Sequence, residues 1–209
     1  VTPVDDPFTD ADESVSTPED TPISGTVLAG TSSVDGPVTV TGFTVAGDAT
    51  AYAAGQTASI AGVGTLTIRA DGSYTFTPAA NYSGPVPVAT YAMTDGSSTD
   101  SSTLTITVSG SNDAPVANAD TNTVPEDTPA TGNVLGNDSD LDGDGLTVTG
   151  FTVGGASYTA GQTATLAGVG TLAIDADGSY VFTPAANYNG PVPVATYTVS
   201  DGTATASST

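Results

Sequence analysis

The feature that most constrains the fold of this chain is an internal repeat. Offsets between matching strings are 106 to 108 residues, which is far too long for a solenoid unit and is the size of a complete immunoglobulin-like domain. The repeat therefore predicts two tandem domains, over residues 1–110 and 111–209. The matching strings are PEDTP (18–22 and 125–129), TVTGFTV (39–45 and 147–153), AGVGTL (61–66 and 167–172), FTPAANY (76–82 and 182–188) and GPVPVATY (84–91 and 190–197).

Local signals within each copy are all of the β type. Residues 171–184 (TLAIDADGSYVFTP) alternate in side-chain character around an Asp-Ala-Asp-Gly turn, which predicts a β-hairpin. Residues 194–207 repeat this pattern around an Asp-Gly turn, and residues 146–153 predict a further alternating strand. We therefore expect an all-β fold of two tandem Ig-like antiparallel β-sandwiches.

The two copies differ at their ends. The first copy closes with residues 97–110 (SSTDSSTLTITVSG), whereas the second stops at residues 203–209 (TATASST), before any LTITV string. We therefore expect the last strand of the second copy to be truncated, as in a fragment of a longer array. A sheet edge that lacks its neighbouring strand is open to strand addition or aggregation.

Charge and composition exclude several classes of function. The chain has 23 acidic residues against a single basic one, Arg69, and its net charge of −22 argues against nucleic acid and anionic membranes as partners. Without His or Cys, it has no Ser-His or Cys-His nucleophile and no His or Cys zinc ligand. Paired carboxylates could still hydrolyse glycosides, but every Asp lies in turn-like sequence, so we expect no enzyme. No run of 18 apolar residues predicts a membrane span.

One loop concentrates carboxylates. In NDSDLDGDGL (137–146) they occupy four alternate positions: Asp138, Asp140, Asp142 and Asp144. Calcium takes six to eight oxygen ligands, and the spacing matches the opening of an EF-hand loop, although position twelve is Thr149 and the flanks predict strands. Asp and Gly are also ordinary turn formers. We favour a Ca²⁺ site, because like charges at about 4 Å repel by about 1 kcal/mol even in water.

The equivalent loop of the first copy is far less acidic. It reads AGTSSVDGP (29–37) and keeps only Asp35, so we expect the metal site in the second copy and not in the first. In an antiparallel sandwich, the loop after the second strand returns toward the segment that precedes the domain. We therefore expect Asp113, and also Asp120, to approach the aspartate loop.

A second acidic pair recurs in each PEDTP string. These residues follow an acidic leader in both copies, and they are either further metal ligands or turn and edge-strand residues. The pairs are Glu19 with Asp20, and Glu126 with Asp127.

Eight tyrosines occur in the same order in the two copies. We expect most to pack in the core with a hydrogen-bonded hydroxyl, and a sugar-stacking platform is the alternative. They are Tyr52, Tyr74, Tyr82 and Tyr91 in the first copy, and Tyr158, Tyr180, Tyr188 and Tyr197 in the second.

Several strings together resemble a known repeat class. NDAPVANAD, EDTP, NVLGNDSDLDGDGLTVTGFT, ADGSYVFTPAANYNG and ATYTVSDG resemble the tandem cadherin-like and Ig-like repeats of giant bacterial adhesins. These include the calcium-dependent RTX adhesins that Gram-negative bacteria export by type 1 secretion. The resemblance implies extender domains that project an adhesive tip, with Ca²⁺ stiffening the joints. It implies Asp113, Glu126, Asp127 and the loop 138–144 as ligands.

These observations lead to one expected function and one rival. We expect a monomeric stalk segment of an extracellular adhesin on the bacterial surface, acting in adhesion and biofilm formation. Its cofactor would be Ca²⁺, and its partners would be the neighbouring repeats of the same chain. The rival is a calcium-assisted polysaccharide-binding module. The near-identity of the two copies argues against the rival, because a specialised tip usually differs from the repeats beneath it.

Overall fold

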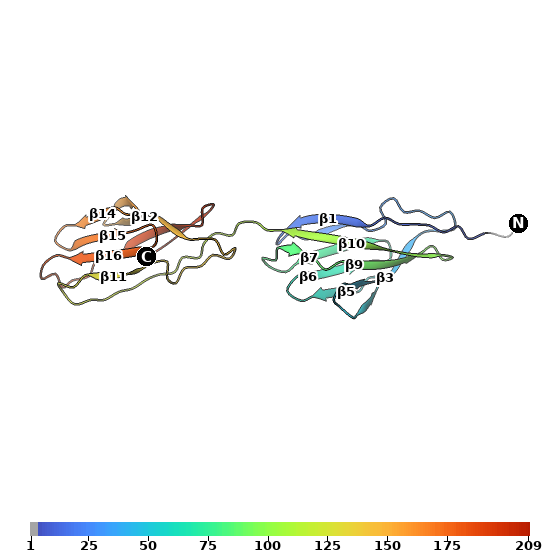
Figure 1. Ribbon diagram of the computed structural model, residues 1–209, viewed down its shortest axis with the longest axis horizontal. Helices are drawn as coiled ribbons and strands as arrows, with labels where there is room; N and C mark the ends of the chain where they lie inside the picture. Colours follow the sequence, from blue (N-terminus) through green and yellow to red (C-terminus); the bar gives the residue numbers. More distant parts are fainter. Residues whose placement is uncertain (1–3) are drawn as a thin grey trace. The chain divides into compact units, whose positions relative to one another are not determined.

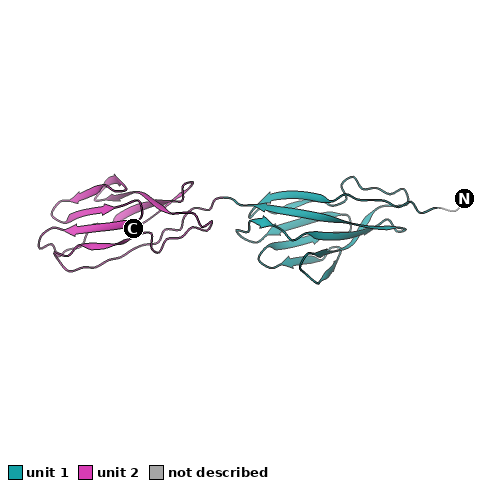
Figure 2. Cartoon of the chain, in the orientation of Figure 1, with its two compact units in different colours: residues 1–111 teal, residues 112–209 magenta. Residues whose placement is uncertain are grey.

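The computed structural model describes residues 4–209 and divides the chain into two compact units, residues 1–111 (unit 1) and 112–209 (unit 2) (Figures 1 and 2). Each regular element in the described part of the chain is a β-strand, which confirms the prediction of an all-β fold with two sandwiches in tandem. Within residues 4–209, no helix could serve as a membrane span.

Unit 1 is a sandwich of two sheets. The first sheet joins, in order, β1 (Glu13–Pro18), β10 (Thr99–Ser109), β9 (Ala89–Thr94), β3 (Thr39–Val45) and β4 (Ala51–Ala53), with β8 (Gly84–Pro85) paired to β10. The second sheet joins β2 (Ile23–Thr26), β7 (Ser73–Pro78), β6 (Gly64–Ile68) and β5 (Thr57–Ile60). β1 runs parallel to the second half of β10, whereas β9 is antiparallel to its first half.

Unit 2 repeats most of this topology. One sheet joins β11 (Ala130–Asn133), β16 (Ser179–Pro184), β15 (Gly170–Ile174) and β14 (Thr163–Leu166). The other joins β13 (Ala156–Thr159), β12 (Thr147–Val153), β17 (Ala195–Ser200) and β18 (Thr205–Ser208). Within residues 112–209, β1 and β8 have no counterpart strand, and β18 matches only the first part of β10.

The predicted hairpins are confirmed, with the expected partners across the strands. Leu172 lies opposite Phe182 and Ile174 opposite Tyr180 in the β15–β16 hairpin, so these apolar side chains share the face that packs into the core. The second hairpin joins β17 to β18, and the predicted strand at 146–153 is β12. Alternation places one apolar side chain on the core face for every polar one outside.

β12 contains a bulge next to a glycine that recurs in both copies. The register of β12 against β17 shifts between Val148 and Gly150. A Cβ atom on Gly150 would lie 2.6 Å from the carbonyl oxygen of Tyr158, so no larger residue fits there. The next residue, Phe151, stacks on the Tyr158 ring with centroids 5.3 Å apart, and this stack closes one side of the core.

The tyrosines belong mainly to the two cores, as predicted. Tyr91 and Tyr197 are the largest fully buried side chains, at 0% and 1% exposure. Tyr74 is also buried, and Tyr52 and Tyr180 pack partly buried against the two cores.

Candidate metal centre

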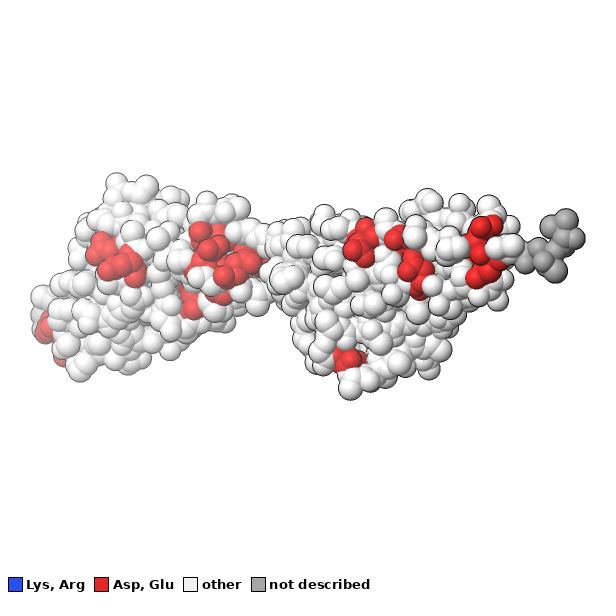
Figure 3. Space-filling model, turned by 45° about the vertical axis from the view of Figure 1, so that its right-hand side comes forward, with Lys and Arg blue, Asp and Glu red and all other residues white. Residues whose placement is uncertain are grey.

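The acidic side chains gather in groups on the surface of each unit, separated by uncharged surface (Figure 3). In unit 2 one group forms where the segment 112–120, here called the leader, runs beside the aspartate loop, residues 137–144. The backbone N–H of Asp113 donates to Asp142 Oδ2 at 2.7 Å. The expected approach of Asp113 to the loop is therefore confirmed.

Two further contacts fasten the leader of unit 2 along the loop. Val116 and Ser139 form an antiparallel bridge, with N···O distances of 2.8 and 3.1 Å. The backbone N–H of Asn118 then donates to Asp138 Oδ1 at 2.7 Å. Burial, followed by the nearby Asp138 carboxylate, raises the pKa of Asp120, the last leader residue. The leader and the loop are therefore held together by a backbone bridge and by carboxylate acceptors.

The loop carboxylates of unit 2 converge. Asp140, Asp142 and Asp144 each offer an oxygen within 4.8 Å of the others. Asp140 Oδ1 accepts the backbone N–H groups of Asp142 and Asp144, at 2.9 and 3.2 Å, which curls the loop around it. Asp201, in the turn between β17 and β18, accepts the side-chain N–H of Asn112 at 2.9 Å, and it lies outside the group of three carboxylates within 4.8 Å of one another.

Unit 1 also brings three carboxylates together, although its loop supplies only one of them. Asp5, Asp35 and Asp95 each offer an oxygen within 4.8 Å of the others. The N–H of Asp6 donates to Asp35 Oδ2 at 2.7 Å, which is the same contact that Asp113 makes to Asp142. A comparison of the two loops alone does not reveal this group, because only Asp35 lies in the loop of unit 1. The other two carboxylates come from the segment that precedes β1, which is the leader of unit 1, and from the turn between β9 and β10.

Around these groups, two aligned positions exchange an acid for a neutral residue between the copies. The repeat aligns four positions: leader, first loop position, second loop position and turn. At the leader position, unit 1 has an acid (Asp5) and unit 2 a neutral residue (Asn112). At the first loop position, unit 1 has a neutral residue (Ser33) and unit 2 an acid (Asp140). The four residues are Asp5, Ser33, Asp35 and Asp95 in unit 1, and Asn112, Asp140, Asp142 and Asp201 in unit 2.

Carboxylates also contact the buried tyrosine hydroxyl of each unit, and they come from different segments in the two units. In unit 1 the Tyr91 hydroxyl contacts the carboxylates of Asp10 and Glu13, and Thr31 donates to Asp10. In unit 2 the aligned Tyr197 hydroxyl contacts the Asp138 carboxylate at 3.0 Å, and the leader contributes the carbonyl oxygen of Asn118. Unit 1 supplies the carboxylate beside this hydroxyl from the segment before β1 (Asp10), and unit 2 supplies it from the loop (Asp138).

Hydrogen bonds and charge set the ionisation of the group in unit 1. The Ser33 hydroxyl and the backbone N–H groups of Ser98 and Ser97 lower the pKa of Asp95 to about 2. Desolvation, followed by the carboxylates of Asp35, Asp95 and Asp6, raises the pKa of Asp5. The lowered pKa keeps Asp95 ionised. The raised pKa of Asp5 shows that a further negative charge beside these carboxylates is unfavourable.

In unit 2 a lowered and a raised pKa occur at two separate places. The Asn112 amide, followed by the N–H groups of Ala204 and Thr203, lowers the pKa of Asp201. Burial, followed by the Asp138 carboxylate, raises the pKa of Asp120. Asp120 Oδ2 and Asp140 Oδ2 are both enclosed, and neither accepts a hydrogen bond from any residue that the structure describes. Enclosed carboxylate oxygens without a donor are suited to a cation.

The PEDTP pairs make turn contacts. Asp20 and Asp127 both have positive φ, at 56° and 59°. Asp20 accepts the backbone N–H of Asn81 at 3.0 Å, and Asp127 accepts that of Asn187 at 2.8 Å. These side chains therefore cap a loop in each unit, as the turn interpretation expects.

The glutamates of the two PEDTP pairs differ from each other. Glu19 is buried and accepts the backbone N–H of Ser111. Glu126 is exposed. Neither belongs to the two groups of carboxylates that lie within 4.8 Å of one another.

A family comparison matches both units separately. The model of the bacterial cadherin-like domain matches residues 4–110 and again residues 112–209. The chain belongs to this family. Bacterial cadherin-like domains are typically extracellular, and cadherin-like domains typically bind calcium. No curated protein matches the chain.

Solved structures similar to these two cadherin-like units are distant in sequence. Titin domains Z1Z2 in complex with telethonin are 15% identical, with 100% of this chain and 95% of that chain covered and a TM-score of 0.34. Drosophila N-cadherin EC1-4 is 14% identical, with 95% of this chain and 46% of that chain covered and a TM-score of 0.47. Murine CEACAM1b is 15% identical, with 97% and 96% covered and a TM-score of 0.28.

Proposed function

We propose that both cadherin-like units bind Ca²⁺ where leader, loop and turn meet, and that the chain is an extender segment of a bacterial surface adhesin. The observation that carries the calcium proposal is that three carboxylate oxygens lie within 4.8 Å of one another in each of the two copies. Hydrogen bonding alone would not require three acids at four aligned positions, because Ser, Thr and Asn satisfy the same turns. A cation requires negatively charged oxygen ligands close together, whichever segments of the chain supply them.

The chemistry of the donors favours calcium among common cations. The candidate ligands are carboxylate oxygens, with no His or Cys in the chain, and hard oxygen donors suit Ca²⁺. In unit 2, Asp140, Asp142 and Asp144 would hold the ion, with Asp113 and Asp201 in the adjoining leader and turn. In unit 1, Asp5, Asp35 and Asp95 would do so. Bound Ca²⁺ would neutralise the repulsion among these groups.

The second proposed ligand set lies beside the tyrosine hydroxyl of unit 2. Asp120 and Asp138 converge there, and Asp120 Oδ2 is an enclosed oxygen with no donor among the described residues. We do not assign Glu19, Asp20, Glu126 or Asp127 to an ion, because Asp20 and Asp127 are used in turns and neither glutamate joins a carboxylate group.

The proposed role is mechanical. The leader of unit 2 follows unit 1 directly in the chain, so fastening Asn112 and Asp113 to the loop shortens the segment that can rotate freely. Extracellular calcium modules bind at about 10⁻⁴–10⁻³ M. At tenfold excess over Kd, binding would add about 1.4 kcal/mol to the stability of a unit. Such a chain would be loose where calcium is scarce and stiff outside the cell, as an adhesin stalk in biofilm formation requires.

Thermal melting and small-angle scattering with Ca²⁺ or EGTA test this proposal on the whole chain. Calcium should raise the melting temperature and narrow the distribution of interatomic distances toward one extended form. Magnesium at the same ionic strength is the control, because its strict octahedral geometry suits a flexible carboxylate loop poorly. An unchanged melting temperature together with an unchanged maximum dimension would refute the proposal.

A further inference from the structure

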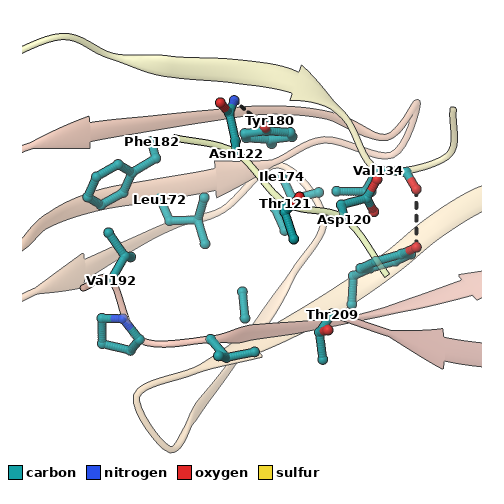
Figure 4. Close-up of a pocket in the computed structure, with 14 residues that line it drawn as sticks. Asp120, Thr121, Asn122, Val134, Leu172, Ile174, Tyr180, Phe182, Val192 and Thr209 are labelled. Atoms are coloured by element: carbon teal, nitrogen blue, oxygen red, sulfur yellow. Dashed lines mark hydrogen bonds between the residues drawn. The ribbon is translucent and has the colours of Figure 1, made fainter. Parts of the chain in front are cut away.

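The eight asparagines of the chain fall into two sets, according to whether the side-chain amide donates a hydrogen bond. Five of them donate from Nδ2, as Asn122 does to the Tyr180 hydroxyl at 2.7 Å (Figure 4). The other four of this set are Asn112, Asn118, Asn133 and Asn137. Within residues 4–209, the side-chain amides of the remaining three, Asn81, Asn187 and Asn189, make no hydrogen bond.

These three amides lie in a turn that follows β7 in unit 1 and β16 in unit 2. Asn81 and Asn187 have positive φ, at 57° and 59°, a conformation that Asn tolerates. In unit 1 the N–H of Tyr82 donates to the carbonyl oxygen of Ala79 at 3.1 Å and closes the turn. Asn81 is exposed. Backbone contacts therefore hold the turn, and the Asn81 amide is left accessible to another molecule.

The turn of unit 1 carries an acceptor motif that the turn of unit 2 lacks. Asn81-Tyr82-Ser83 matches N-x-S with a residue other than Pro in the middle, the motif for N-linked glycosylation in surface loops of secreted proteins. Ser83 is exposed, and its hydroxyl makes no hydrogen bond to any residue that the structure describes. Asn189 stands at the position of Ser83 in unit 2, so that turn has the amide and lacks the hydroxyl.

The chain has a second N-x-S motif, Asn137-Asp138-Ser139, whose groups are already engaged. Asn137 Nδ2 donates to the carbonyl oxygen of Ala119 at 3.2 Å. The backbone of Ser139 is bridged to Val116, and Asp138 accepts the N–H of Asn118, as described above. A transferase would have to break these contacts to reach the Asn137 amide, and each broken hydrogen bond costs free energy. The motif at Asn81 is therefore the accessible one.

We propose that Asn81 is the acceptor of an N-linked glycan, transferred from a sugar that a phosphate ester activates at its anomeric carbon. Asn81 Nδ2 attacks that carbon and the bond from the carbon to the phosphate oxygen breaks. The phosphate leaves with the electron pair, and one amide proton passes to a base of the transferase. The exposed turn has room for a bulky, hydrophilic group. Bacterial cadherin-like domains are typically extracellular, where such a group meets only solvent.

Two reactions on the folded whole chain test the proposal and distinguish the source of the sugar. One uses a soluble N-glycosyltransferase with UDP-glucose. The other uses an oligosaccharyltransferase that reads N-x-S/T alone, with an oligosaccharide linked to a lipid diphosphate. In at least one reaction the intact mass should rise by a single glycan, and peptide mapping should place that glycan on Asn81. No transfer in either reaction, or transfer to any other asparagine of the native chain, would overturn the proposal.

Three variants check the location. Ser83→Ala should abolish transfer while Asn81 stays in place, and Asn81→Gly should abolish it while the turn keeps its positive φ. Both variants should melt at the temperature of the native chain. Asn189→Ser supplies the missing hydroxyl and should add a second glycan, on Asn187. Native transfer to Ser83→Ala, or no second glycan on Asn189→Ser, would contradict the proposal. Neither Asn81 nor Ser83 belongs to a carboxylate group, so the result is independent of the calcium proposal.

Discussion

Replacing Asp142 by asparagine changes the charge of the aspartate loop with little change in shape. The amide oxygen can still accept the N–H of Asp113, which the carboxylate accepts at 2.7 Å. What is lost is one negative charge among three carboxylates whose oxygens lie within 4.8 Å of one another. The variant should therefore stabilise unit 2 in EGTA and weaken its response to calcium.

The magnitude follows from the geometry. At that separation, two unit charges repel by about 0.9 kcal/mol in water, and Asp142→Asn removes two such pairs. Screening at physiological salt leaves about 1 kcal/mol, or about 4–8 °C in the melting temperature of a domain this size. With a Kd near 10⁻³ M, 10 mM calcium stabilises the native loop by about 1.4 kcal/mol. A tenfold weaker Kd reduces this gain to about 0.4 kcal/mol.

Differential scanning calorimetry of the whole chain, in EGTA and in 10 mM calcium, measures both effects. Asp175→Asn is the matched control, because it removes the same charge where unit 1 carries Arg69 at the aligned position. The control should keep the full calcium response. The reasoning is refuted if Asp142→Asn is destabilising in EGTA, or if it responds to calcium as strongly as the control does.

Three other substitutions test separate parts of the structure. Tyr197→Phe removes a buried hydroxyl and should destabilise unit 2 by about 1–3 kcal/mol by calorimetry; no change would mean that its acceptors are satisfied otherwise. Gly150→Ala should disrupt β12, measured as faster amide exchange there, because its Cβ would lie 2.6 Å from the Tyr158 carbonyl oxygen. The Tyr52 hydroxyl, followed by a backbone N–H, lowers the pKa of Asp48, so this carboxylate contributes stability above its unfolded pKa that is lost as pH falls through the lowered value. Tyr52→Phe should raise that pKa in an NMR titration, and an unchanged value would contradict the assignment.

The strands and hairpins were predictable because they depend on local pattern. Alternation and the Asp-Gly turns placed β15, β16, β17 and β18, and the period of the repeat separated two units of one topology. The approach of Asp113 to the aspartate loop was also predictable, since it follows from the direction of successive strands.

The carboxylate group of unit 1 was not predicted because its members lie far apart in the sequence. Asp5, Asp35 and Asp95 come from three segments, and only folding brings them together. A usable signal was present: aligning the copies shows Asp5 opposite Asn112 and Ser33 opposite Asp140, an exchange that conserves charge. The contacts of Tyr91 and Tyr197 with carboxylates carried no comparable local signal, because a buried hydroxyl finds its partners through packing.

The account depends most on calcium binding at the leader and loop of both units. A calcium titration of the whole chain, followed by backbone amide signals in NMR spectra, tests this directly. The amides of Asp6 and Asp113 are the best reporters, because each donates to a loop carboxylate at 2.7 Å. The account predicts saturable shifts of both signals at calcium concentrations near the millimolar range. Shifts in one unit only, or a linear drift of all acidic residues without saturation, would contradict it.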